Sequence, residues 1–161
     1  MSRVAIIIAM LAARSLVLTA EPTTQPKEEH TVKPRSHIPR EQLKQIFDGI
    51  RLQTKWNMDG EMLWGYFFVD REPERLKRLQ QQLETTGYRF VDLHEVEKEG
   101  SKTGDFMLHV ERVETHDVDS LDTRNGELDA LAAEYGVREY DGMDVGPVIT
   151  ATPPAATRPA R

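Results

Sequence analysis

Apolar residues recur along the middle of the chain with two different periods, and each period predicts a type of element. In "LKQIFDGI" (43–50) they fall at i, i+3, i+4 and i+7, the spacing of one helix face. In "DFMLHVERV" (105–113) they alternate, as in a strand with one covered face. The run "LWGYFFV" (63–69) is apolar throughout, which predicts a central strand covered on both faces. Together with turn and capping residues, the patterns predict helices over 40–52 and 73–86, strands over 63–69, 88–96, 105–113 and 137–143, a polar loop over 97–104, and a helix that Asp119 or Ser120 caps and Gly136 ends.

The order of these elements, one helix and then β-α-β-β-α-β, predicts the fold class. The simplest arrangement is a ferredoxin-like α+β sandwich of four mostly antiparallel strands with two helices on one face. The first helix is an addition, expected at an edge of the sheet or across its open face. Gly87 is predicted to end a helix, as Gly136 does, and Asp141-Gly142 to end or bend the last strand. Asn125-Gly126 costs the last helix about 1 kcal/mol, so its first turn is expected to be irregular.

The two ends of the chain differ from this middle part. In residues 1–20, the basic residue Arg3 precedes an apolar stretch, which Arg14 interrupts, and small residues before a polar break; this pattern predicts a signal peptide cleaved after Ala20. The alternative is a misassigned start, with Met10 opening a short leader. Residues 21–39 are rich in proline and charge and predict a disordered tether, and 148–161 predict a disordered tail rich in proline and alanine. The folded domain is therefore expected over 40–147.

Charge changes the picture of the partners. The chain of 161 residues has a net charge of −6, but residues 60–147 carry 21 acidic against 10 basic side chains. Such a domain repels phosphate backbones, which argues against direct nucleic-acid binding and favours a basic protein partner. The absence of cysteine excludes disulfides and thiol chemistry. After cleavage of the leader, no segment is expected to insert stably in a membrane.

Two polar clusters invite a metal interpretation, and neither supports one. A calcium loop that started at Asp117 would need an oxygen ligand at its fifth position, where Leu121 stands. Carboxylates there are better explained by the start of a helix, which attracts negative charge. The second cluster has two histidines on neighbouring strands but no third histidine or cysteine, and is expected on a solvent face. No phosphate loop or hydrolase motif is present, so we expect no enzyme activity, metal or cofactor. The clusters consist of His116, Asp117, Asp119 and Asp122, and of Asp92, His94 and His109.

Three aromatic residues, Trp64, Tyr66 and Phe68, share one face of the first predicted strand. On this topology such residues stack bases in RNA-recognition modules. The acidic charge and the lack of a matching basic-aromatic element argue against that role here. Packing in the core, or against a protein partner, is the better interpretation.

Several motifs, taken in order, resemble the family of regulators of ribonuclease activity B, protein inhibitors of ribonuclease E. They are "NMDG" (57–60), "WGYFFVD" (64–70), "LETTGY" (83–88), "LDALAAEYG" (128–136) and a terminal Tyr-Asp-Gly (140–142), and the resemblance covers about 40–147. It implies an acidic, ferredoxin-like domain without enzyme activity that binds a ribonuclease or its degradation complex.

The resemblance also implies site residues. Tyr140 and Asp141 of the terminal motif join the three aromatics of the first strand as candidate partner contacts, while the motif glycines have structural roles. Family members typically continue Tyr-Asp-Gly with tryptophan, but Met143 stands here. Methionine fills the volume of the tryptophan but does not supply the same rigid contact.

Two functions therefore remain. In the first, a cytoplasmic domain masks a basic surface of its partner, with steering by its acidic face. In the second, the signal peptide is real, and an exported domain of the same fold has an envelope or extracellular binding role, because it would never meet cytoplasmic ribonuclease E.

Overall fold

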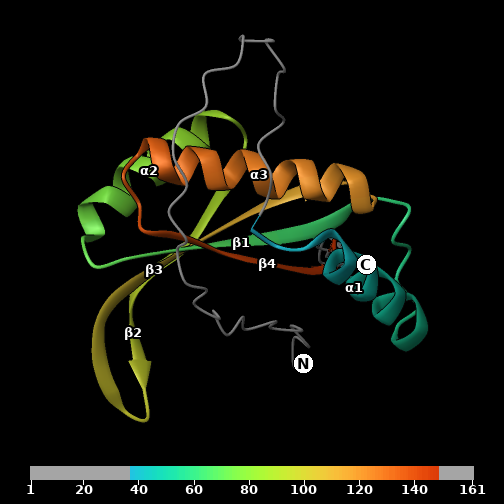
Figure 1. Ribbon diagram of the computed structural model, residues 1–161, viewed down its shortest axis with the longest axis horizontal. Helices are drawn as coiled ribbons and strands as arrows, with labels where there is room; N and C mark the ends of the chain where they lie inside the picture. Colours follow the sequence, from blue (N-terminus) through green and yellow to red (C-terminus); the bar gives the residue numbers. More distant parts are fainter. Residues whose placement is uncertain (1–36, 149–161) are drawn as a thin grey trace, which may run out of the picture.

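The structure is a computed structural model, and it describes residues 37–148 (Figure 1). The chain order is one helix followed by β-α-β-β-α-β, as the apolar patterns predict. The elements are α1 (Arg40–Gln53), β1 (Met62–Asp70), α2 (Pro73–Thr85), β2 (Arg89–Lys98), β3 (Ser101–Glu114), α3 (Val118–Glu134) and β4 (Glu139–Pro147).

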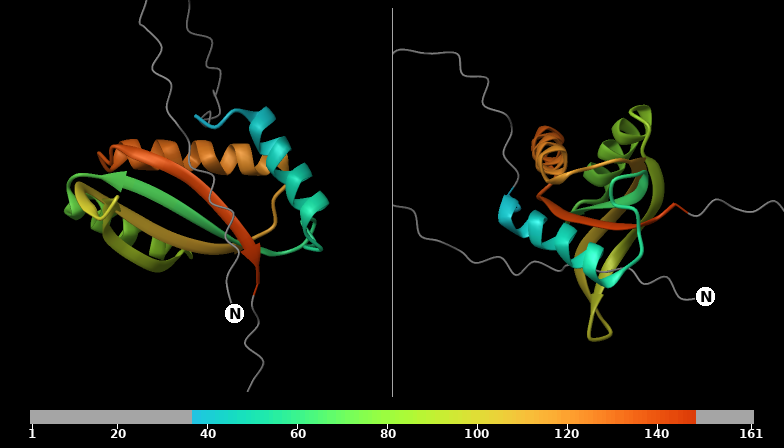
Figure 2. Two further views of the ribbon diagram at one scale, coloured as in Figure 1. Left: turned by 90° about the horizontal axis from the view of Figure 1, so that it is seen from below. Right: turned by 90° about the vertical axis from the view of Figure 1, so that its right-hand side faces the viewer.

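The four strands form one sheet in the order β2-β3-β1-β4, and every neighbouring pair is antiparallel. Helices α2 and α3 lie together over one face, and the other face carries no helix in the described part of the chain (Figure 1). This is the predicted ferredoxin-like sandwich. The additional helix α1 lies at the β4 side of the sheet and crosses near one end of α3 (Figure 2).

Helix α1 packs against the rest of the domain through the apolar residues from which it was predicted. Leu43, Phe47 and Ile50 are buried, and the Phe47 ring lies 6.0 Å from the ring of Trp64 on β1. Burying each such side chain contributes about 1.5–3 kcal/mol. The helix ends at Thr54, whose hydroxyl donates a hydrogen bond to the Ile50 carbonyl at 2.9 Å.

The connection between β2 and β3 is much shorter than the predicted loop over 97–104. The strands extend to Lys98 and from Ser101, so two residues, Glu99 and Gly100, make the turn. Both have positive φ, 53° and 76°, the geometry of a tight hairpin turn whose twist matches the strands. The hairpin projects past the rest of the sheet (Figure 1). A polar strand that extends into solvent lacks the apolar alternation that identifies a covered strand.

Helix α3 starts earlier than expected and is regular throughout. Its N-cap is Asp117, not Asp119 or Ser120: the Asp117 side chain accepts from the Ser120 amide at 2.7 Å, and the Ser120 hydroxyl accepts from the Asp117 amide at 2.9 Å. Asn125 and Gly126 are buried inside the helix rather than marking an irregular turn.

The last strand runs over 139–147 instead of 137–143. Val137 still belongs to the helix end, because its amide donates to the Ala132 carbonyl at 2.9 Å. Gly87 follows the end of α2 and Gly136 follows the end of α3. Their φ values are 92° and 67°, as expected for residues that end helices.

The predicted signal peptide, tether and tail lie almost wholly outside the described residues and stay predictions. Within 37–148, no helix has the length and hydropathy needed to cross a membrane.

Candidate protein-binding site

The aromatic residues predicted as partner contacts on β1 face the helices. Trp64, Tyr66 and Phe68 are 1%, 0% and 0% exposed. The Trp64 ring packs edge-on against His116 with centroids 5.3 Å apart, and Phe68 lies 5.2 Å from Tyr140. All three side chains pack between the sheet and the helices, and none lies on the uncovered face. Their role as partner contacts stays a prediction.

The Tyr-Asp-Gly motif forms a bulge in β4. The pairing with β1 slips between Phe67 and Phe68, so Asp141 has no directly opposite residue. Tyr140 is buried, and its hydroxyl donates to the Asn125 side chain on α3 at 2.7 Å. Asp141 is half-buried, and burial, with the nearby charge of Glu139, raises the pKa of its carboxyl. The motif therefore anchors α3 to the sheet through its tyrosine and leaves its aspartate partly accessible.

Gly142 and Met143, which follow Asp141, have structural roles in β4. Gly142 has φ of 112°, which the bulge requires and which a side chain disfavours. Met143 is 9% exposed and lies next to α1.

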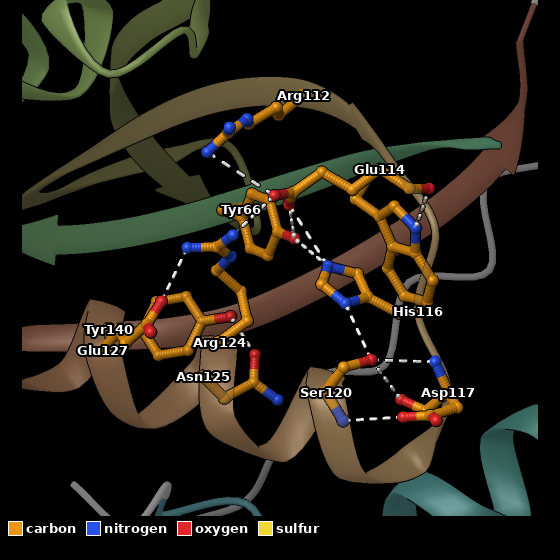
Figure 3. A network of polar contacts seen from close by, with 11 residues as sticks. Tyr66, Arg112, Glu114, His116, Asp117, Ser120, Arg124, Asn125, Glu127 and Tyr140 are labelled. Carbon is orange, nitrogen blue, oxygen red and sulfur yellow. Dashed lines mark hydrogen bonds and ion pairs between the residues drawn. The ribbon is translucent and has the colours of Figure 1, made fainter. Parts of the chain in front are cut away.

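A buried polar network joins β1, β3 and α3 around Glu114 (Figure 3). One Glu114 oxygen accepts from the Tyr66 hydroxyl at 2.8 Å and lies 3.2 Å from His116 Nε2. The other accepts from Arg124 at 2.7 Å and lies 3.5 Å from Arg112. These four partners surround both oxygens of a side chain that is 9% exposed.

The network shifts two pKa values in opposite directions. Burial by itself would raise the pKa of Glu114, but hydrogen bonds from His116 and Tyr66 and the charge of Arg124 outweigh it and lower that pKa to about 2. Burial and the neighbouring Glu114 charge raise the pKa of the Tyr66 hydroxyl well above its usual range. Glu114 is thus ionised and Tyr66 neutral at every physiological pH.

The network contains a hydroxyl, an imidazole and a carboxylate in the order used by hydrolases. Ser120 Oγ lies 3.2 Å from His116 Nδ1, and His116 Nε2 lies 3.2 Å from Glu114. The Ser120 hydroxyl, however, already accepts from the Asp117 amide and donates to the Asp117 carbonyl, as a capping group does. The groove described below does not include it. The arrangement therefore fixes the start of α3 on the sheet.

Sequence reasoning missed this network, although one signal pointed to it. Glu114 continues the alternation of 106, 108, 110 and 112, which places it on the helix-covered face. An acid at such a position needs buried donors.

The uncovered face of the sheet is acidic. Register and alternation place four carboxylates and one guanidinium on it outside the hairpin tip, and the guanidinium is paired with one of the carboxylates. The residues are Arg89 and Asp92 on β2, Glu111 on β3, and Glu139 and Asp144 on β4.

At the centre of this face, Gly65 lets two polar side chains approach the sheet. A Cβ at Gly65 would come within 2.2 Å of Asp144 Oδ1 and 2.7 Å of His109 Nε2. The His109 ring stacks on Phe67 with centroids 4.4 Å apart, and burial lowers its pKa against the opposing charge of Asp144. Asp92 lies directly opposite His109 on the neighbouring strand and pairs with His94 at 2.9 Å, so the three residues of the predicted polar cluster lie together on this face. Residues 37–148 contain no group of three side chains placed to hold a metal ion.

A groove of about 310 Å³ runs between α1 and the outer edge of β4. Two apolar residues of β4, one face of α1 and the Trp64 ring form most of its lining. Its lining residues are Gln42, Gln45, Ile46, Gly49, Ile50, Gln53, Trp64, Met143, Asp144 and Val145.

Comparison with known proteins decides the relationship. The family model described as regulator of ribonuclease activity B matches residues 40–145. The chain belongs to this family. No curated protein matches the chain. The regulator B match begins at the first residue of α1 and ends within β4, so it includes the additional helix, the Glu114 network and all the lining residues of the groove. All of these features are thus parts of a regulator B domain and not of the flanking segments.

Proposed function

We propose that this regulator B domain binds a ribonuclease, such as ribonuclease E, and lowers its activity without catalysing a reaction itself. The family match over residues 40–145 carries the proposal. The uncovered acidic face supports a mechanism in which the domain covers a basic surface that the ribonuclease uses for RNA. Residues 37–148 carry 24 acidic and 14 basic side chains, which favours steering toward such a surface.

The mechanism predicts which charges matter. Asp92 and Glu139 lie on the uncovered face and are exposed, so reversing both to lysine places repulsive charge there without disturbing the core. We expect a loss of roughly tenfold or more in affinity for purified ribonuclease E, because rim charges govern encounter and salt dependence. Inhibition of RNA cleavage should fall in parallel.

A matched control reverses two exposed glutamates, Glu74 and Glu84, on α2, which covers the opposite face. These variants should inhibit as the unmodified protein does. An absence of inhibition at micromolar excess of the unmodified domain would refute the proposal. Equal losses in the two double variants, or binding that does not respond to salt, would refute the role of the acidic face.

The predicted signal peptide supports a second candidate, an exported domain with an envelope or extracellular binding role. Cell fractionation and N-terminal sequencing separate the two. A mature N-terminus at Glu21 in a non-cytoplasmic fraction would exclude ribonuclease inhibition in the cell, and a cytoplasmic protein would exclude export.

A further inference from the structure

The outer edge of β4 is an open strand edge. β4 pairs only with β1 in the sheet order, so its other side carries backbone N–H and C=O groups that no described strand satisfies. Along 143–145 this edge faces α1 across the groove of about 310 Å³. A strand edge beside a helix, with an apolar channel between them, is the geometry with which domains bind an extended peptide as an additional strand.

One glycine, Gly49, lines this channel without an internal reason to be glycine. Gly49 lies in the middle of α1, where glycine costs about 0.5–1 kcal/mol relative to alanine. A Cβ there would meet nothing within 4 Å, and the φ of Gly49 is not positive. Glycine without such needs is explained by the close approach of another backbone, which a side chain would block.

The walls of the channel favour a particular occupant. On α1, three amide side chains, Gln42, Gln45 and Gln53, line it and make no hydrogen bond within residues 37–148. Amides donate to and accept from peptide groups. On β4, Met143 and Val145 offer apolar surface toward the helix side, and Asp144 between them points to the uncovered face and is the charged group of the lining.

We propose that an extended segment of a protein partner adds to the β4 edge in this channel, with a lysine or arginine opposite Asp144 and an apolar residue on each side of it. Directly opposite residues of paired strands share a face, so the basic side chain lies on the same face as the Asp144 carboxylate, which leans over Gly65, while its two neighbours enter the channel. The negative net charge of the domain also favours a positively charged partner segment. This inference deepens the proposed function, on which it rests, by naming where a regulated partner docks and in what form.

The test uses the full chain and peptides rather than a ribonuclease. Random 12-residue peptides displayed on phage are selected against the protein, and the enriched sequences are synthesised and titrated by fluorescence anisotropy. We expect enrichment of apolar-basic-apolar triplets. In NMR spectra, peptide addition should shift the amides of Met143 to Val145. N-methylation of the peptide at the alternate positions that face β4 should abolish binding, and methylation at the positions between should not.

Variants locate the site. Gly49→Leu fills the channel and Asp144→Lys reverses its charge, and each should raise the Kd at least tenfold. Lys44→Leu places the same apolar side chain on α1 outside the channel, at an exposed residue, and should leave the Kd unchanged. Circular dichroism of each variant verifies that the domain is folded.

Three outcomes would overturn the inference. One is that no peptide is enriched, and another is that enriched peptides bind the Gly49→Leu variant as tightly as the original. The third is slow hydrogen exchange of the outer β4 amides in the free protein, which would show that another part of the chain or a second copy already occupies the edge. The proposed function fails separately, because a protein that binds peptides at β4 but leaves ribonuclease E fully active would retain the docking channel and lose the regulatory role.

Discussion

Replacing Glu114 with glutamine tests whether the buried network holds α3 on the sheet by charge. The carboxylate accepts hydrogen bonds from Tyr66 and Arg124 and has His116 beside it. Glutamine keeps the shape of the side chain but removes its negative charge. It also replaces one carboxylate oxygen, an acceptor, by an NH2 group that would face the donors of the network. Removing one partner from a buried ion pair is costly because the other charge stays buried.

The pKa shift gives the magnitude. The pKa of Glu114 falls from 4.5 to about 2 on folding, and each unit corresponds to about 1.4 kcal/mol, so the ionised group contributes about 3 kcal/mol to the free energy of unfolding. Because the folded value lies below the unfolded one, this contribution is complete above pH 4.5 and is lost as the pH falls toward 2. The glutamine variant cannot titrate in this window.

Urea denaturation followed by tryptophan fluorescence measures the effect. At pH 7 we expect Glu114→Gln to lower the free energy of unfolding by about 3 kcal/mol, and near pH 2 the difference from the unmodified protein should shrink to about 1 kcal/mol or less. Glu127→Gln is the matched control: Glu127 pairs with the same Arg124 at 2.6 Å but is 50% exposed, so its loss should cost less than about 1 kcal/mol. Equal losses in the two variants, or a Glu114→Gln deficit that stays constant down to pH 2, would refute the reasoning.

Three further changes test other parts of the domain by the same denaturation assay. Tyr140→Phe leaves Asn125 without its hydroxyl donor and should cost about 1–2 kcal/mol; an unchanged midpoint would mean that the contact is not needed. Gly65→Ala drives a Cβ toward Asp144 Oδ1 and should move the Asp144 side chain, which NMR shifts of that residue would reveal, at a cost of about 1 kcal/mol because a side-chain end can shift. Asp117→Ala removes the N-cap of α3 and should cost about 1 kcal/mol, and a loss below a few tenths would contradict the capping assignment.

The sequence predicted the elements whose apolar residues repeat against a covered face. All four strands and all three helices belong to this class, and their order was sufficient for the ferredoxin-like sandwich. The errors lie where local polar chemistry decides. Asp117 caps α3 through a reciprocal bond with Ser120, but three acids stand within six residues there, and charge pattern alone does not separate them. The tip of the β2-β3 hairpin is polar on both sides, so no alternation marks it.

The site was harder to predict than the fold for a physical reason. Alternation shows that Trp64, Tyr66 and Phe68 share a face, but both faces of β1 are apolar, so the sequence does not show which one the helices cover. The groove depends on the distance between α1 and β4, which are far apart in sequence and whose separation no local pattern encodes. The sequence does contain one signal of the groove, which is Gly49, a glycine inside a helix where no turn requires it.

The two edges of the sheet have opposite consequences for self-association. The register between β2 and β3 shifts twice, between Phe90 and Asp92 and between Glu95 and Glu97, and β2 contains many charged residues. Irregular, charged edges discourage growth of a sheet from one molecule to the next. β4 has one irregularity, early in the strand, and a smooth continuation. A molecule with one protected and one open edge can be extended on a single side only, so accidental pairing through β4 would stop at two copies and could not propagate into a fibre.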